Sequence, residues 1–273
     1  MSVKKISFIG AGNMTKAIIE GLVANGYKAE HIMASNPSRP KLDILANELN
    51  IHITQDNAEA IAFADVVIMA VKPQLMETVC KDMLSRATVD DKLVISIAAG
   101  ISAKRFSEML GGHERVVRVM PNTPSSLGQG MSGIYAPSNV TQQDAEFTAY
   151  IMDHVGKTLI VAQEDDIDTV IAAAGSSPAY FFLIAQCMQE EAIKMGLTAD
   201  DARLLVQQAM LGSAQMMVAN PDVSLETLRK NVTSKGGTTA EAVASLQKNN
   251  IAHILSDAMR SAVKRASQMT QEF

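Results

Sequence analysis

Two glycine-rich turns are the parts of this sequence whose residue types and spacing could bind a charged ligand. The first contains Gly10 and Gly12 and stands between the apolar run of residues 6–9 and a helical apolar pattern. Gly10 permits a tight turn, and Gly12 lets backbone N–H groups approach a pyrophosphate that the next helix N-terminus attracts. An ordinary strand-to-helix turn also carries glycines, and Thr15 replaces the third glycine of G-x-G-x-x-G. The order of strand, glycines and helix favours dinucleotide binding.

The second turn combines glycines with hydroxyl groups: Ser234, Gly236, Gly237, Thr238 and Thr239. Thr238 and Glu241 have the Thr-x-x-Glu spacing of a capping box, so we expect a helix to begin there with free backbone N–H groups before it. Such an N-terminus favours an anion. Physical chemistry alone leaves two interpretations open: a site for a substrate carboxylate, or an ordinary Gly-Gly turn between helices.

The composition is that of a globular protein whose partners are small molecules. Of the 273 residues, 47% are hydrophobic and 19% are charged, which suits two well-packed domains. The formal net charge of -5 supplies no basic footprint, so we expect neither nucleic acid nor an anionic membrane as the main partner.

The cysteines, the histidines and the first residues predict a cytoplasmic protein without a metal site. Cys80 and Cys187 lack C-x-x-C spacing and lie in apolar helical surroundings, so we expect buried free thiols in a reducing cytoplasm. The five histidines contain no i, i+4 pair, and no Asp/Glu cluster completes a ligand set. We expect no secretory signal and no membrane span, since no uninterrupted apolar run has the required length.

The elements around the first turn indicate where a cofactor would lie. A second strand at residues 32–35 ends in Ser35 and Asn36, where an NAD-preferring fold usually has an acidic residue; the first carboxylate is Asp43. Arg39 can offer a planar fork to a 2′-phosphate, which favours NADP over NAD. The alternative is that Arg39 only caps a solvated loop.

Three further strand ends should face the same ligand, because ligands of open α/β sheets bind outside the carboxyl ends of strands. The apolar run of residues 65–71 leads to Ala70–Pro73, residues 92–97 lead to Ala98 and Ala99, and residues 115–120 lead to Asn122. Plain turns also use Pro and Asn, so position carries this prediction more than residue type does.

Strands and helices alternate as far as residues 158–161, and the rest of the chain has the apolar periodicity of helices. We predict an α/β fold, with a Rossmann-type doubly wound sheet in residues 1–162 and an all-helical domain in residues 163–273. The helical half has more apolar side chains than a domain of its size can bury by itself. We therefore infer that subunits pack against one another through it.

The sequence resembles the Δ1-pyrroline-5-carboxylate reductase family, whose members catalyse the last step of proline biosynthesis. The resemblance runs from end to end and rests on Phe8–Met14, Ala70–Pro73, Ala98–Gly100, Asn122–Pro124, Gly175–Tyr180, and Ser234 with Gly236–Thr239. The last stretch, in a chain with a helical second half, is the most specific. Two positions depart from the pattern: Thr15 stands where glycine or alanine is common, and Ser177 where glycine is common.

The resemblance implies reduction of the cyclic imine L-1-pyrroline-5-carboxylate to L-proline by NADPH, with NADH as an alternative. It implies an interlocked dimer and a ring of dimers, a decamer. It places the substrate carboxylate in the second turn, which can come from the neighbouring subunit, with Thr239 as the catalytic residue near the imine nitrogen. The cofactor-binding residues expected from sequence and resemblance together are Gly10, Gly12, Asn13, Met14, Ser35, Asn36, Arg39, Asn57, Ala70, Val71, Lys72, Pro73, Ala98, Ala99 and Asn122.

Two other functions remain as alternatives. A β-hydroxy acid dehydrogenase shares the two-domain plan but usually has a catalytic lysine on the long helix after the glycine-rich turn, and residues 176–191 contain no lysine; Lys194 lies too far along. A noncatalytic NADP-binding regulator would bind the cofactor without turnover, and the complete second turn argues against it.

Overall fold

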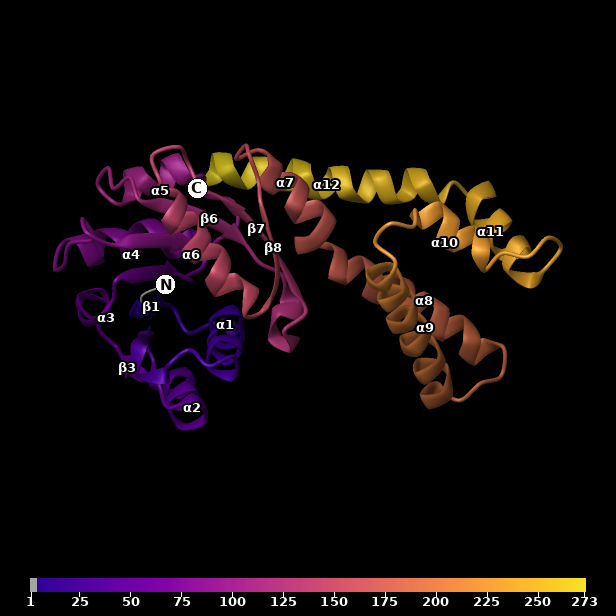
Figure 1. Cartoon of the computed structure of the whole chain (residues 1–273), viewed down its shortest axis with the longest axis horizontal. Coiled ribbons are helices and arrows are strands. Elements are labelled where there is room, and N and C mark those ends of the chain that lie inside the picture. Colours follow the sequence, from indigo (N-terminus) through magenta and orange to yellow (C-terminus); the bar gives the residue numbers. More distant parts are fainter. Residues whose placement is uncertain (1–3) are drawn as a thin grey trace. The chain divides into compact units, whose positions relative to one another are not determined.

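The computed structural model describes residues 4–273, which form two compact units (Figure 1). The first unit runs as far as Ser176 and also includes Ser261–Phe273. The second unit is Ser177–Arg260. The compact first unit therefore continues beyond residue 162, where the sequence places the domain boundary, and takes in the end of the chain.

The first unit contains an eight-stranded sheet in the order β3-β2-β1-β4-β5-β6-β7-β8 (Figure 1). Its strands are β1 (Ile6–Ile9), β2 (Ile32–Ser35), β3 (His52–Thr54), β4 (Val66–Met69), β5 (Leu93–Ser96), β6 (Val116–Met120), β7 (Gly130–Tyr135) and β8 (Gly156–Ile160). All neighbours are parallel except β6 and β7. This confirms the predicted Rossmann-type sheet.

The register of the central strands makes one level edge. Ile9 at the end of β1 pairs with Ser35 at the end of β2 and with Met69 at the end of β4. Met69 in turn pairs with Ser96 at the end of β5. The turns that follow these four strands therefore begin side by side, which is the arrangement of a ligand site in an open α/β sheet.

Helices cover both faces of this sheet. They are α1 (Asn13–Ala24), α2 (Arg39–Leu49), α3 (Asn57–Phe63), α4 (Pro73–Leu84), α5 (Ala103–Met109), α6 (Gln142–Asp153) and α7 (Asp166–Val170), with short 3-10 turns at Ala29–His31 and Thr123–Leu127 and a π turn at Ile171–Gly175. The helices α1, α2 and α6 pack in one apolar cluster, and α3, α4 and α5 pack in another. Because β4 is buried on both faces, its sequence is continuously apolar rather than alternating.

The N-terminus of α6 carries a buried carboxylate. The Thr141 hydroxyl accepts a hydrogen bond from the Asp144 N–H at 3.1 Å and so caps the start of α6. The Asp144 carboxylate accepts hydrogen bonds from Arg115 Nε and Nη2 at 3.2 and 3.0 Å and lies 3.4 Å from Lys4 Nζ. Burial would raise the pKa of Asp144, but Arg115, Thr141 and Lys4 outweigh burial and hold that pKa below its usual value.

The second unit is helical (Figure 1), and many of its apolar side chains are exposed within the described chain. Its helices are α8 (Ser177–Lys194), α9 (Ala199–Ala219), α10 (Leu225–Asn231), α11 (Thr238–Lys248) and the first part of α12 (Ile251–Glu272). No side chain of α8 is buried, and Phe182 is 70% exposed. A surface of this kind is typical of a protein–protein interface.

One sequence expectation for this helical region needs correction. Cys187 on α8 is exposed in the chain, whereas Cys80 on α4 is buried as expected. Among the described residues, the continuous helix Asp166–Lys194 is long and apolar enough to cross a membrane, with a mean hydropathy of 1.4 in its best window. Length and composition are weak evidence for a span, and a helix that packs against another subunit passes the same test.

Candidate functional site

The first glycine turn packs closely against the residues after β4 at Gly10 and is open at Gly12. Gly10 has φ +107°, and a Cβ there would lie 2.7 Å from the carbonyl oxygen of Ala70. Only glycine adopts that conformation without strain. At Gly12 no atom lies within 4 Å of the position a Cβ would occupy, so this part of the turn has space for a ligand.

The open side of the turn offers hydrogen-bond donors. Gly12 is the N-cap of α1, and no hydrogen bond within residues 4–273 occupies the N–H of Gly12 or Asn13. The first turn of α1 contains no acidic residue that would repel an anion. Free N–H groups at the positive end of a helix are the usual site for a phosphate group.

The end of β2 brings three of the predicted cofactor residues together. Ser35 is buried, and its Oγ donates a hydrogen bond of 2.7 Å to Oδ1 of Asn57, the first residue of α3. Asn36 Oδ1 accepts a hydrogen bond of 3.3 Å from the N–H of Ala11, and Asn36 Nδ2 donates to the carbonyl of Ser38 at 3.0 Å. Asn36 therefore ties the turn after β2 to the glycine turn.

Arg39 is the first residue of α2 and stands on the exposed side of the β2 turn. Its Nη2 lies 2.7 Å from Asp43 Oδ1, one helical turn along α2. A 2′-phosphate on this side would share the guanidinium with that carboxylate. The ion pair is solvent-exposed, so it is weak enough to give way to a doubly charged phosphate.

The turn after β4 has the conformation expected from its sequence. Lys72 is the extended N-cap of α4, and Pro73 occupies the first helical position. The N–H of Ala70 donates to the carbonyl of Ile9 at 2.9 Å, which places this turn directly beside the glycine turn. Val71 lies on the same side, since its Cγ1 would be 3.2 Å from a Cβ at Gly10.

The ends of β5 and β6 differ in what their predicted residues do. Ala98 is buried, and Ala99 is half-buried beside it, so small side chains follow the level edge. The side chain of Asn122 is instead engaged within the protein: its Nδ2 donates to the carbonyl of Ala174 at 3.0 Å, and its Oδ1 accepts from Met131 N–H at 2.9 Å. Asn122 thus fixes the π turn against the sheet.

The second glycine turn opens α11, but not through the predicted capping box. Gly237 is the N-cap, Thr238 is the first helical residue, and no side chain caps the helix. Gly236 has φ +71°, a conformation that favours glycine, and a Cβ at Gly237 would lie 2.5 Å from Ser234 Oγ, so a larger residue at Gly237 would displace that hydroxyl. Because the helix starts one residue too early for the box, Thr238 does not satisfy the backbone donors.

The result is a second exposed helix N-terminus with unused donors. In the described chain the N–H groups of Thr238 and Thr239 have no hydrogen-bond partner, and both residues are exposed. The third N–H, that of Ala240, is taken by the carbonyl of Gly237 at 3.0 Å. The two free N–H groups suit a carboxylate. The cofactor residues lie in the first compact unit and this turn in the second.

The π turn and the first residues of α8 contain features that the sequence did not predict. Ile171–Gly175 forms a π turn, a conformation that often marks functional sites. Ser177 does not have a positive φ, since the non-glycine residues with positive φ in the described chain are Asn50 and Asn250. The backbone at Ser177 therefore does not require glycine. The phenol oxygen of Tyr180 is buried and has no partner among the described residues. No periodicity in the sequence signals a π turn.

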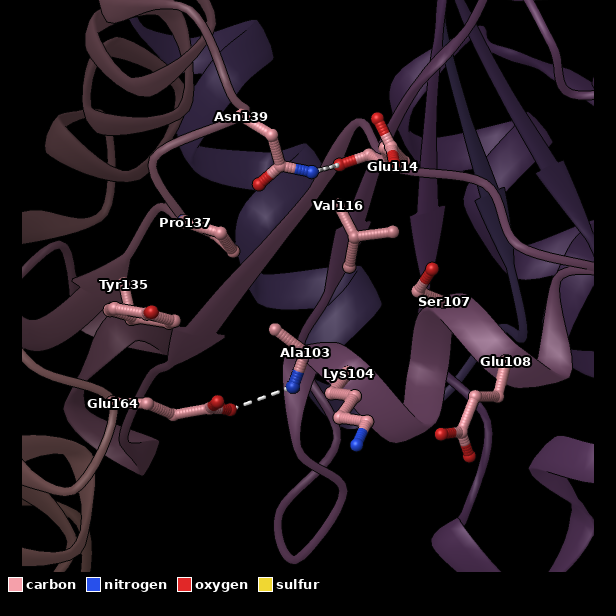
Figure 2. Close-up of a pocket in the computed structure, with 10 residues that line it drawn as sticks. All are labelled: Ala103, Lys104, Ser107, Glu108, Glu114, Val116, Tyr135, Pro137, Asn139 and Glu164. Atoms are coloured by element: carbon pink, nitrogen blue, oxygen red, sulfur yellow. Dashed lines mark hydrogen bonds between the residues drawn. The ribbon is translucent and has the colours of Figure 1, made fainter.

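A cavity of about 330 Å³ lies elsewhere, beside α5 and the first residue of β6. Figure 2 shows Glu164 pointing toward the backbone nitrogen of Ala103, to which it is hydrogen-bonded at 2.7 Å. None of the predicted cofactor or substrate residues lines this cavity. Three of its charged residues are glutamates, which makes it unsuited to a phosphate.

The described residues contain no cluster of metal ligands, and the buried thiol is not activated. Over residues 4–273, no group of three or more His, Cys, Asp or Glu side chains is placed to hold a metal ion. Burial raises the pKa of the Cys80 thiol to about 12, with a smaller contribution from Glu77, so this thiol is uncharged at neutral pH.

Family models match both units of the chain. The model described as "Pyrroline-5-carboxylate reductase dimerisation" matches residues 164–269. The model described as "NADP oxidoreductase coenzyme F420-dependent" matches residues 5–100, which include the first glycine turn and the turn after β4.

Similar proteins cover the whole chain. The pyrroline-5-carboxylate reductase of Vibrio alginolyticus is 54% identical over 273 residues, all of both chains. The structure of a pyrroline-5-carboxylate reductase from Coxiella burnetii is 40% identical, with a TM-score of 0.91, and the match covers 98% of this chain and 99% of that one. The Plasmodium falciparum pyrroline carboxylate reductase, crystallised with NADP bound, is 29% identical, with a TM-score of 0.87 and 99% of each chain covered.

Proposed function

Because the chain belongs to the pyrroline-5-carboxylate reductase family, we propose that it reduces L-1-pyrroline-5-carboxylate to L-proline with NADPH, the last step of proline biosynthesis. The observation that carries this proposal is the presence of two open helix N-termini in one chain: one at Gly12 for a dinucleotide phosphate and one at Thr238 for a substrate carboxylate. Residues 1–162 are the proposed cofactor domain, and residues 163–273 the proposed dimerisation and substrate domain.

The residues at the level edge fit a dinucleotide. The space at Gly12 admits the pyrophosphate, and the N–H groups of Gly12 and Asn13 are free to donate to it. We assign Ser35, Asn57 and Arg39 to the adenosine end, where the hydroxyl and amide groups bind the ribose and the guanidinium binds a 2′-phosphate. Asn36 holds this end to the glycine turn through Ala11.

The remaining edge residues belong with the nicotinamide half. Ala70, Val71, Lys72 and Pro73 form the turn beside Gly10, and Ala98 and Ala99 follow the next strand. Small side chains and backbone in this place allow a flat ring to approach closely. Asn122 supports the same region through the backbone around Ala174, while Met14 packs against the apolar cluster of α1, α2 and α6.

In this reaction the main role of the protein is to position the cofactor and the substrate. NADPH supplies a hydride when bound, and a protonated cyclic imine is already an electrophile. The free N–H groups of Thr238 and Thr239 hold the substrate carboxylate, and Gly236, Gly237 and Ser234 give the turn the shape that exposes them. The hydroxyl of Thr239 orients the ring nitrogen and hydrogen-bonds its proton. Correct orientation of two reactants is itself worth a large part of a barrier.

The assembly follows from the uncovered second unit. The chain carries a dimerisation domain, and the exposed apolar side chains of α8 and α9 are the surface that a second subunit would cover. In an interlocked dimer the Thr239 turn of one subunit serves the cofactor edge of the other, and dimers join into a ring of ten subunits. We place the enzyme in the cytoplasm, where its free thiols stay reduced.

A pair of measurements on the Thr239→Ala variant tests this assignment. We expect turnover with NADPH and pyrroline-5-carboxylate to fall far more than NADPH affinity does, because the residue belongs to the substrate site. Thr233→Ala is the matched control, since its hydroxyl already donates to the Arg229 carbonyl at 2.7 Å. Equal losses of turnover and NADPH affinity in Thr239→Ala would remove Thr239 from the substrate site.

A further inference from the structure

Thr15, which replaces the third glycine of the dinucleotide motif, makes a contact that glycine or alanine cannot make. Its side chain is fully buried, and its Oγ1 donates a hydrogen bond of 2.6 Å to the carbonyl oxygen of Gly10. Thr15 is the third residue of α1, so the bond runs back from the helix to the turn that precedes it.

This bond fixes the orientation of one peptide group at the centre of the turn. The carbonyl of Gly10 and the N–H of Ala11 belong to the same planar peptide. The carbonyl accepts from Thr15, and the N–H donates to Asn36 Oδ1 at 3.3 Å. The N–H of Gly10 is also held, since it donates to the Ser35 carbonyl at 2.8 Å. The peptide is therefore clamped from α1 on one side and from the β2 turn on the other.

The fixed Gly10–Ala11 peptide is important because the N–H groups that follow it, those of Gly12 and Asn13, are free to bind a ligand. Gly10 has a positive φ, and rotation of its following peptide would redirect the N–H groups of Gly12 and Asn13. We propose that Thr15 is a positioning residue for the cofactor: its hydroxyl holds the glycine turn in the conformation that presents these N–H groups to the NADPH pyrophosphate. This inference rests on the proposed function for its ligand, and on the observed bond for its mechanism.

The test measures NADPH affinity without the imine, by fluorescence titration of the purified protein. Thr15→Val keeps the shape and loses the hydroxyl, and we expect its dissociation constant for NADPH to rise about five- to tenfold, the usual worth of one buried hydrogen bond. Thr15→Ser restores the hydroxyl and should restore most of the affinity. In steady-state assays the KM for NADPH should rise while the KM for the imine stays unchanged.

Thr148 supplies a matched control. It is also fully buried, and its Oγ1 donates at 2.9 Å to a backbone carbonyl, that of Asp144 in α6, away from the glycine turn. Thr148→Val should lower the free energy of unfolding about as much as Thr15→Val does, and it should keep wild-type NADPH affinity. Should Thr15→Val not fold, Thr15→Ala serves, since alanine also lacks the hydroxyl and is smaller than valine.

Two outcomes would overturn the inference: wild-type affinity in a folded Thr15 variant without the hydroxyl, or an equal loss of affinity in Thr148→Val. A wild-type protein that binds NADPH but does not reduce the imine would contradict the proposed function and leave the role of Thr15 intact.

Discussion

Replacing Gly12 with alanine should separate cofactor binding from folding. Gly12 has ordinary extended geometry, with φ −81°, and the space where a Cβ would project is open. Alanine is a poorer N-cap than glycine by about 0.5–1 kcal/mol, but it also restricts the unfolded chain, which returns about 0.4–1 kcal/mol. The two effects nearly cancel, so we expect the free energy of unfolding to change by less than about 0.5 kcal/mol.

The same methyl group occupies the space that the pyrophosphate needs. We expect NADPH to bind at least about tenfold more weakly, because displacing it by even a fraction of an ångström breaks charge-assisted hydrogen bonds worth about 1.5–3 kcal/mol each. Gly10→Ala is the contrasting variant. Its φ of +107° and the 2.7 Å approach to the Ala70 carbonyl should cost about 2–4 kcal/mol of folding free energy.

Urea unfolding and NADPH titration of both variants are the measurements. A Gly12→Ala protein with wild-type affinity would show that the pyrophosphate does not lie over this turn. A Gly12→Ala protein as unstable as Gly10→Ala would show that the open space above the turn is not present in solution.

Two further predictions concern single charged groups. Arg39→Ala should weaken NADPH about tenfold and leave NADH unchanged, through loss of a charged hydrogen bond; an unchanged NADPH to NADH ratio in binding titrations would assign Arg39 to its ion pair with Asp43 alone. Asp144→Asn should lower the unfolding free energy at pH 7 by about 1–3 kcal/mol. Because the folded state lowers the pKa of Asp144, its contribution is present above the ordinary carboxyl pKa of about 3.9 and is lost as the pH falls below it. The difference between wild type and variant should therefore shrink in acid-unfolding curves, and a constant difference down to pH 2 would refute the role.

Local signals in the sequence predicted much of the fold. Thr141 and Thr198 each precede an aspartate by three positions, a spacing that predicts a helix start, and both hydroxyls accept a backbone hydrogen bond at the N-terminus of a helix. The continuous apolar run of β4 correctly indicated a strand buried on both faces. These features depend on residues within a few positions of each other, so a single sequence contains them.

The errors have a different origin. Thr238 has the same spacing as Thr141, but the Gly236 turn, which has φ +71°, starts α11 one residue earlier than the box requires. Cys187 lies in an apolar helix like Cys80 does, but no residue of its helix α8 is buried within the described chain. A single sequence does not state which apolar face another subunit covers.

The candidate site was predictable in its turns and not in its side-chain contacts. The glycines and strand ends were found from local patterns. The bond from Asn122 to Ala174 joins residues 52 positions apart, and the bond from Ser35 to Asn57 joins residues 22 positions apart. Such pairings depend on the order and register of strands, which the sequence does not specify locally. The hydrogen bond from Thr15 to Gly10 is local. The sequence shows only that Thr15 replaces the third glycine of the motif, and it does not show which contact the threonine makes instead.

The central claim is hydride transfer from NADPH to the imine carbon. NADPH deuterated at the transferred position of the nicotinamide, incubated with the purified protein and pyrroline-5-carboxylate, tests it directly, with proline analysed by mass spectrometry. We expect L-proline that carries the deuterium on the former imine carbon. Bound NADPH with no labelled proline would contradict it.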